Sequence, residues 1–334
     1  MINVGLVGFG LSGKYLQAPF FQVNEKFNLK SIVTSQEIPK HNFPDTKRVD
    51  SFEKLLEDQN ISLISICSPS HTHFEYGKRC LLAGKNVLLE KPMTATSQEA
   101  EELIKMAKDL NLVLYIFQNR RFDSDFMTLK SIIESGVLGE IHSYEAHFDR
   151  FKPILNTKKW KETALPASGI LYDLGAHLID QSICLFGKPS KVSGSVFTQR
   201  DGSEIDDAFN LYLDYGKLKV TLKSSLMIKN QGPKYTVHGS KGSFTKFGLD
   251  IQEDHLVEGF WPNQPGFGFE KDEFKGTLKA EMNGLDFIGK IDTIGGNWGL
   301  LFDDLFEVIQ NNKPAIVEHQ QIIEQLKIIE AIKM

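Results

Sequence analysis

The sequence predicts two domains, an α/β domain with a doubly wound parallel sheet followed by an α+β domain with a mostly antiparallel sheet. The chain has 334 residues, more than the ~100 to 150 of one typical domain. Its first third alternates short apolar runs with amphipathic stretches, whereas several later segments alternate apolar and polar side chains with period two. We therefore expect domains at 1–119 and 120–334.

Continuous apolar runs predict the strands of the first domain, because helices on both faces of a parallel sheet bury both sides of each strand. One intervening helix has a capping box, in which Thr96 is followed three residues later by Glu99, and it should end near Asn111. The predicted strands are 2–7, 29–34, 63–67, 87–89 and 112–117.

In the second domain, one helix is predicted to end at Gly136, a second covers about 169–186, and a helical pattern over 301–334 is broken at Pro314. A loop is expected at 261–268, which contains two prolines and two glycines. The predicted antiparallel strands lie around 144–148 and at 192–197, 209–213 and 218–222.

Composition excludes several classes of protein. Hydrophobic residues make up 41% and charged residues 24% of the chain, which is typical of a globular protein. The apolar runs fall short of the ~18 to 20 residues that cross a bilayer, and a net charge of −5 disfavours nucleic acid as a partner. Three scattered cysteines without a C-x-x-C spacing suggest neither disulfides nor zinc, and no signal peptide is evident. We expect a cytoplasmic protein without a metal.

A glycine-rich motif follows the first strand and opens a helix: Gly8-Phe9-Gly10-Leu11-Ser12-Gly13. In this context G-x-G-x-x-G is typical of dinucleotide binding, with glycines for the turn, for approach of the pyrophosphate and for helix packing. The alternative is a glycine-rich turn that binds nothing. An NAD site usually has a carboxylate at the end of the second strand, but here Thr34, Ser35 and Gln36 follow. Hydroxyls can donate to a 2′-phosphate, so this favours NADP, with NAD still possible and a polar loop without contacts as the alternative.

Further polar residues lie where the next strands end, at the edge that binds ligands in open α/β sheets. Lys91, in Glu90-Lys91-Pro92, could exchange a proton with a substrate hydroxyl if a cationic nicotinamide lowered its pKa; the alternative is a solvated lysine. His71 and His73 follow Ser68-Pro69 and could border the cofactor, or merely begin a helix. Asn119 follows the last strand, where a phosphate or substrate contact is possible.

On the helix predicted at 169–186, Asp173, His177 and Asp180 have the spacing i, i+4, i+7 and should share one face. Asp173 and His177 could form a carboxylate–imidazole pair that acts as a general base. Two alternatives remain, a metal site, for which no further ligand is evident, and a buried histidine held by a carboxylate for structure.

Together these motifs resemble the glucose-fructose oxidoreductase and inositol dehydrogenase family, over nearly the whole chain. The similarity is carried by Gly8–Gly13, Ser68-Pro69 with His73, Glu90-Lys91-Pro92 and the segment from Gly169 to His177. Asn119-Arg-Arg and Lys159-Trp160 make the chain most similar to the NADP-dependent scyllo-inositol dehydrogenase branch.

The resemblance implies a Rossmann domain joined to an α+β domain with a large open sheet, whose open face forms dimers or tetramers. It implies that Lys91 contacts the substrate hydroxyl, that His177 is the acid and base, and that Asp173 orients it. It also implies that Trp160 lies near the nicotinamide end and that Thr34 and Ser35 meet the adenosine ribose or its phosphate. Gln36 departs from the arginine found in similar members.

We therefore predict an NADP(H)-dependent oxidoreductase that transfers a hydride between the nicotinamide and a secondary alcohol or ketone of a cyclic polyol or sugar. The expected assembly is a homo-oligomer, with neither a nucleic-acid nor a membrane partner. Alternatives are an NAD-dependent sugar dehydrogenase and a non-catalytic nucleotide-sensing regulator. The presence of Lys91, Asp173 and His177 favours an enzyme.

Overall fold

The computed structural model describes residues 1–157 and 162–333. The chain forms two compact units, which we call the nucleotide unit and the sheet unit. The nucleotide unit comprises Met1–Asn119, Gln252–Phe267 and Asn297–His319; the sheet unit comprises Arg120–Ile251, Gly268–Gly296 and the chain from Gln320. Two stretches from the second half of the chain thus join the first unit, which a single boundary at residue 119 does not anticipate.

The nucleotide unit contains a six-stranded sheet in which all neighbouring strands are parallel. The strand order is β3-β2-β1-β4-β5-β6, so the chain reverses its winding direction on either side of β1 and β4, as in a doubly wound fold. The predicted fold class of this part is confirmed. The strands are β1 Ile2–Val7, β2 Phe27–Val33, β3 Lys47–Val49, β4 Leu63–Ile66, β5 Asn86–Leu89 and β6 Leu114–Ile116.

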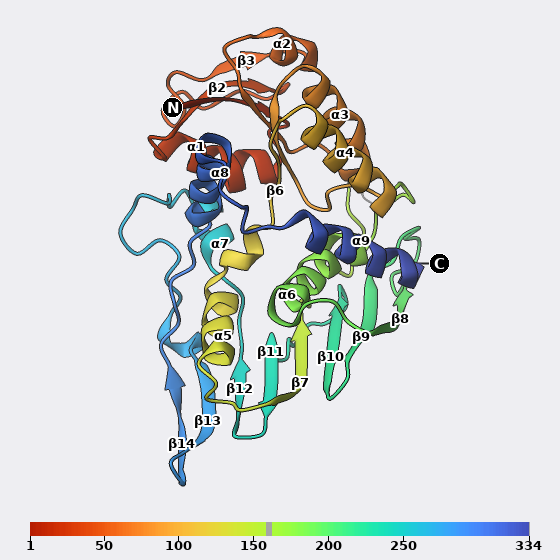
Figure 1. The fold of residues 1–334 in the computed structure, drawn as a ribbon, viewed down its shortest axis with the longest axis vertical. Helices are drawn as coiled ribbons and strands as arrows, with labels where there is room; N and C mark the ends of the chain where they lie inside the picture. The colour runs from red at the N-terminus through yellow and green to blue at the C-terminus, as the bar shows by residue number, and fades with distance from the viewer. Residues whose placement is uncertain (158–161, 334) are drawn as a thin grey trace. The chain divides into compact units, whose positions relative to one another are not determined.

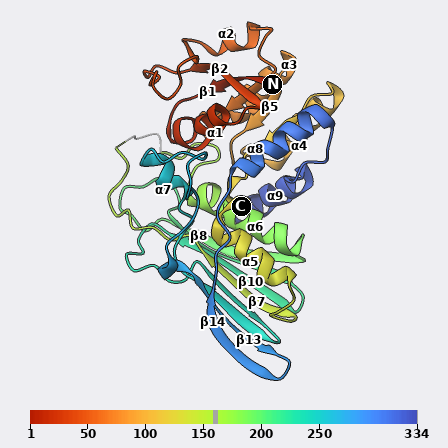
Figure 2. The same ribbon diagram turned by 90° about the vertical axis from the view of Figure 1, so that its left-hand side faces the viewer.

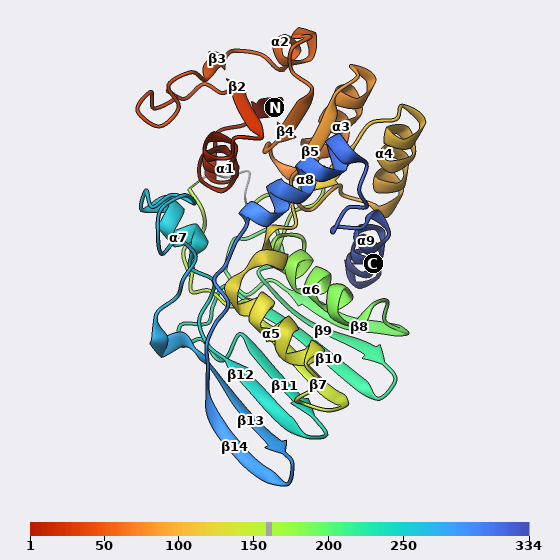
Figure 3. The same ribbon diagram turned by 60° about the vertical axis from the view of Figure 1, so that its left-hand side comes forward.

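Helices cover this sheet. Helix α3 packs beside α4, and α8, from the second half of the chain, packs beside α1 (Figures 1 and 3), with the rings of Phe20 and Phe302 stacked 5.0 Å apart. The capping box of Thr96 and Glu99 is confirmed at the start of α4. The helices are η1 Ser12–Gln17, α1 Ala18–Val23, α2 Phe52–Glu57, η2 Ser70–Thr72, α3 His73–Leu82, α4 Ser97–Asp109, α7 Gln252–Val257 and α8 Gly299–Asn311.

The sheet unit is built on an eight-stranded sheet of order β14-β13-β12-β11-β7-β10-β9-β8. Only β7 and β10 pair in parallel among the described strands of this sheet; the other neighbours are antiparallel. The mostly antiparallel sheet is therefore confirmed. The strands are β7 Ile141–His147, β8 Lys191–Phe197, β9 Ala208–Tyr215, β10 Leu218–Ser225, β11 Tyr235–Gly239, β12 Gly242–Lys246, β13 Gly276–Met282 and β14 Leu285–Ile291.

One face of this sheet is covered by α5 Ser124–Glu134 and by η5 Leu171–Gly175 with α6 Ala176–Phe186 (Figures 2 and 3). On β9, Leu211 and Leu213 are buried whereas Tyr212 between them is 51% exposed, because successive side chains point to opposite faces. The sheet therefore presents one open face in the described part of the chain. Helix α9 His319–Lys333 follows the predicted break at Pro314.

Strands β3 and β11 to β14 and helix α7 were not predicted. Strand β14 shows why, since Leu285 and Ile288 are 74% and 66% exposed and its pattern has no consistently buried face. None of the described helices is long and apolar enough to span a membrane.

Candidate active site

The glycine-rich turn joins β1 to η1 and contains glycines with different roles. Gly8 has a φ of +92°, and a Cβ there would lie 2.7 Å from the carbonyl oxygen of Cys67. A Cβ at Gly13 would overlap the carbonyl oxygen of Gly8, whereas a Cβ at Gly10 would meet nothing within 4 Å. The fold itself requires Gly8 and Gly13, while the open space at Gly10 fits a pyrophosphate that approaches the backbone.

The end of β2 is tied to this turn. The amide of Gly8 donates to the carbonyl of Val33 at 3.1 Å, and Gln36 Nε2 donates to the carbonyl of Phe9 at 2.9 Å. Thr34 Oγ1 accepts a hydrogen bond from the Gln36 amide at 3.0 Å, and Ser35 is exposed. Gln36, at the position that departs from similar family members, thus connects the β2 end to the glycine turn.

Glu90, at the end of β5, also serves the turn. Its Oε1 accepts hydrogen bonds from Ser12 Oγ and, at 3.0 Å, from Gln17 Nε2, while Oε2 accepts from the Lys91 amide at 2.9 Å. Burial raises the pKa of Glu90, and the neighbouring Lys91 opposes that rise. The Glu90 carboxylate therefore joins two strand ends within the protein and holds Ser12 in place.

His73 makes a second connection between strand ends. Its Nδ1 lies 2.8 Å from the carbonyl oxygen of Pro92 and its Nε2 lies 3.0 Å from that of Ser68. Burial lowers the pKa of His73, and the hydrogen bonds to the two carbonyls oppose that shift. This histidine brings the Ser68-Pro69 turn beside the Lys91-Pro92 turn. The structure thus gathers most of the predicted cofactor residues at the carboxyl edge of the parallel sheet.

An aromatic group beside the glycine turn was missed by sequence reasoning. The ring of Phe43 lies 6.0 Å from that of Phe9 and 5.6 Å from that of Trp261, in the stretch of the nucleotide unit that also holds α7. Helix α7 lies against η1. Trp261 is more than 200 residues from Phe43 along the chain, so no local pattern could have found this contact.

In the sheet unit, the predicted helix begins with the π-helical turn η5. Gly169, with a φ of +97°, leaves no room for a Cβ against the Asp206 carboxylate, which accepts a hydrogen bond from the Leu171 amide at 2.9 Å. Asp173 is exposed and His177 is 4% exposed. The wider π turn means that the α-helical spacing does not apply across η5.

Asp180 has a different partner from the one that its spacing suggested. Arg121 Nε and Nη2 donate to its two carboxylate oxygens at 2.8 and 2.6 Å, and both side chains are buried. This bidentate ion pair ties α6 to the segment before α5. Among the described residues, no group of three His, Cys, Asp or Glu side chains is arranged to hold a metal ion.

His177 lies beside Phe148, with ring centroids 6.5 Å apart. Two buried cations contact the Phe148 ring, Arg120 at 5.4 Å and Lys234 at 5.2 Å. Buried carboxylates accompany them: Asp125 lies 2.7 Å from Lys234, and Asp123 lies 3.4 Å from Arg120. This buried charge cluster next to the predicted acid and base was not recognised in the sequence, because its members come from separate elements.

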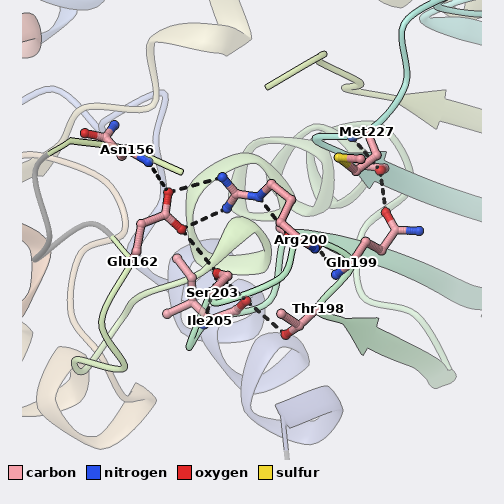
Figure 4. Close-up of polar contacts among 10 residues, drawn as sticks. Asn156, Glu162, Thr198, Gln199, Arg200, Ser203, Ile205 and Met227 are labelled. Atoms are coloured by element: carbon pink, nitrogen blue, oxygen red, sulfur yellow. Dashed lines mark hydrogen bonds and ion pairs between the residues drawn. The ribbon is translucent and has the colours of Figure 1, made fainter. Parts of the chain in front are cut away.

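Two predicted residues remain. Asn119 is buried just after β6, and Trp160 lies outside the described residues. The residues that flank 158–161 are anchored (Figure 4): Glu162 accepts hydrogen bonds from Arg200 Nη1 and Nη2 at 3.2 and 2.9 Å and from the Asn156 amide at 2.8 Å. Asp207 accepts from Arg200 Nε at 2.9 Å. Asn156 and Glu162 are therefore both connected to the β8–β9 connection through Arg200.

Known proteins are similar to this chain in sequence and in fold. The chain is 37% identical over 331 residues to scyllo-inositol 2-dehydrogenase (NADP(+)) IolW of Bacillus subtilis, covering 99% of this chain and 92% of that protein. It is also 37% identical to the uncharacterized oxidoreductase YhhX of Escherichia coli, covering 99% and 95%. The structure of the oxidoreductase YvaA of Bacillus subtilis matches with a TM-score of 0.94 at 36% identity, covering 100% and 96%.

Family models cover almost the whole chain. The model described as the NAD-binding Rossmann fold of the Gfo/Idh/MocA oxidoreductase family matches residues 2–118. The model of the C-terminal alpha/beta domain of the same family matches residues 130–334. The glycine turn, with the hydrogen bonds from Gln36 and to Glu90 that hold it, is the structural feature that fits the nucleotide-binding domain of this family. The chain therefore belongs to the Gfo/Idh/MocA family of oxidoreductases and is an enzyme that uses a nicotinamide cofactor.

Proposed function

We propose that this enzyme is an NADP(H)-dependent dehydrogenase that interconverts a secondary alcohol and a ketone on a cyclic polyol or sugar. The observation that carries the proposal is the full-length similarity to scyllo-inositol 2-dehydrogenase (NADP(+)) IolW together with the presence of Lys91, Asp173 and His177. A second relative supports it: myo-inositol 2-dehydrogenase of Thermotoga maritima is 27% identical over 212 residues.

In the proposed reaction, a nicotinamide cofactor held by the glycine turn would supply hydride transfer to and from the substrate carbon. Lys91 contacts the substrate hydroxyl, and His177 removes its proton during oxidation and returns it during reduction. Asp173 orients the imidazole. The protein thus supplies positioning and proton transfer from a buried imidazole.

NADP is the proposed cofactor because the three residues that follow β2, Thr34, Ser35 and Gln36, include no carboxylate that would repel a 2′-phosphate. With Gln36 bonded to Phe9, the hydroxyls of Thr34 and Ser35 are left to bind the ribose or its phosphate. The amides that follow Gly8 in the turn, up to Gly13, hold the pyrophosphate. Ser68, Pro69, His73, Glu90 and Asn119 complete the proposed cofactor site, with Trp160 at the nicotinamide end.

We further propose a cytoplasmic homo-oligomer formed through the open face of the eight-stranded sheet. Tyr212, at 51%, and Phe197, at 41%, leave apolar area exposed in the isolated chain. Burial of such side chains against a second copy would be favourable.

Separate titrations with NADPH and NADH, followed by turnover on a panel of inositols and sugars, test the cofactor and the reaction. Lys91→Ala and His177→Ala should lower kcat by about 100-fold or more, as loss of an acid or base does. Exposed residues supply matched controls, Lys105→Ala and His142→Ala. Parental turnover in Lys91→Ala and His177→Ala would contradict the proposed roles. Cofactor binding without turnover across a broad panel would favour a nucleotide-sensing regulator.

A further inference from the structure

Arg150 lies at the carboxyl end of β7, on the side of the sheet that carries His177. Along β7, Tyr144 and Ala146 are buried on the helix-covered face, and Phe148 continues this alternation just after the strand. Period two places Arg150 on the same side. Its guanidinium carbon lies 5.4 Å from the centroid of the Phe148 ring, and that ring neighbours His177.

Arg150 differs from the other two cations on the Phe148 ring. Arg120 and Lys234 each have a buried carboxylate nearby, Asp123 and Asp125 respectively. Arg150 is only half-buried, and its guanidinium makes no ion pair with any residue in the described part of the chain. Guanidinium groups held against an aromatic ring keep their five N–H donors available to a planar or tetrahedral anion.

The backbone around Arg150 is held by a neighbouring basic segment. The Arg150 amide donates to the Ser225 carbonyl at 2.9 Å, the Lys152 amide donates to the Leu226 carbonyl at 2.7 Å, and the Ile228 amide donates to the Arg150 carbonyl at 3.1 Å. Residues 150–157 and 226–233 contain Arg150, Lys152 and Lys229 without one Asp or Glu. The carboxylate of Asp149, which precedes them, accepts a hydrogen bond from the Ser225 amide at 3.0 Å.

We propose that the substrate carries an acidic group, a carboxylate or a phosphate, and that Arg150 binds it. This inference rests on the proposed function and narrows its substrate class from neutral polyols to sugar or polyol acids and phosphates. The planar fork of Arg150 can donate two parallel hydrogen bonds to such a group. Arg150 and His177 both lie beside the Phe148 ring, so an acid group bound by Arg150 would position the adjacent alcohol carbon for the reaction.

Steady-state kinetics on matched substrates test the proposal. Glucose, glucuronate and glucose 6-phosphate share one ring and differ in the acid group, so that a preference for one acid distinguishes carboxylate from phosphate. We expect kcat/KM to be higher for one acid than for glucose. Arg150→Gln should reduce the ratio of kcat/KM for the acid to kcat/KM for glucose about 10- to 100-fold, as loss of a charge-assisted hydrogen bond does. Arg150→Lys, which keeps the charge, should recover part of the preference.

The control is Lys191→Gln, an exposed lysine on β8, which should keep the parental ratio. An equal kcat/KM for neutral and acidic substrates, or an acid preference that survives in Arg150→Gln, would overturn the proposal. If Arg150→Gln binds NADPH more weakly but keeps the parental preference for the acid, Arg150 binds a phosphate of the cofactor and not the substrate. That result would also overturn the proposal. Calorimetric titration of each acid onto the protein reads binding directly, and a protein that binds neither NADPH nor NADH would instead refute the proposed function.

Discussion

Alanine at Gly10 separates the part that the glycine turn plays in the fold from its part in cofactor binding. A Cβ at Gly10 meets no atom within 4 Å, and Gly10 is not among the glycines with a positive φ. The substitution therefore introduces neither a clash nor backbone strain. Alanine also restricts the unfolded chain. We therefore expect the free energy of unfolding of Gly10→Ala to equal that of the parent or to exceed it by up to ~1 kcal/mol.

Cofactor affinity should respond differently. A methyl group at Gly10 would occupy the space through which a pyrophosphate approaches the backbone. If it costs one amide-to-phosphate hydrogen bond, worth ~1.5 to 3 kcal/mol, the Kd for NADPH rises about 10- to 150-fold. Titration by NADPH fluorescence measures this change, and urea unfolding of the same sample measures stability.

Gly13→Ala is the matched control within the same turn. Its Cβ would overlap the Gly8 carbonyl oxygen, so the backbone must move. We expect a loss of ~1 to 3 kcal/mol in the free energy of unfolding, as for an overpacked core site. Parental NADPH affinity in a folded Gly10→Ala protein would refute the assignment of that space to a cofactor, and parental stability in Gly13→Ala would refute the packing argument.

Three further predictions concern buried polar groups. Arg121→Met leaves the Asp180 carboxylate buried without its bidentate partner and should cost ~3 to 5 kcal/mol of unfolding free energy in urea; unchanged stability would contradict this. Burial raises the pKa of Glu90 above 4.5, so above that pH the folded protein binds more protons than the unfolded chain and stability falls with rising pH. Glu90→Gln should flatten that slope in unfolding measured at about pH 5 to 7, and a slope equal to the parent's would exclude Glu90 as its source. Arg200→Lys loses the paired hydrogen bonds to Glu162 and should lower the urea midpoint by the equivalent of ~1 to 3 kcal/mol, with a parental midpoint as the contrary result.

Strong local patterns account for the elements that could be predicted. The strands β1, β4 and β5 are mostly apolar runs, and α4 begins with a capping box. The local sequence therefore predicts each of these elements without information from the rest of the chain. Strands β11 to β14 and the short α7 lack such patterns. The side chains of these strands face solvent on one side or lie at the sheet edge, and pairing with neighbours rather than local hydrophobicity makes them strands.

The same division holds for the site. The sequence alone determined the glycine turn, the fold class and the family, because the spacing of Gly8, Gly10 and Gly13 is local and its chemistry follows from backbone geometry. Tertiary structure alone decided that Glu90 binds Ser12 and that Asp180 pairs with Arg121. Those partners are separated by 78 and 59 residues. A hydrogen bond or an ion pair forms only when folding brings both groups within about 3 Å, so no periodicity along the chain can reveal it.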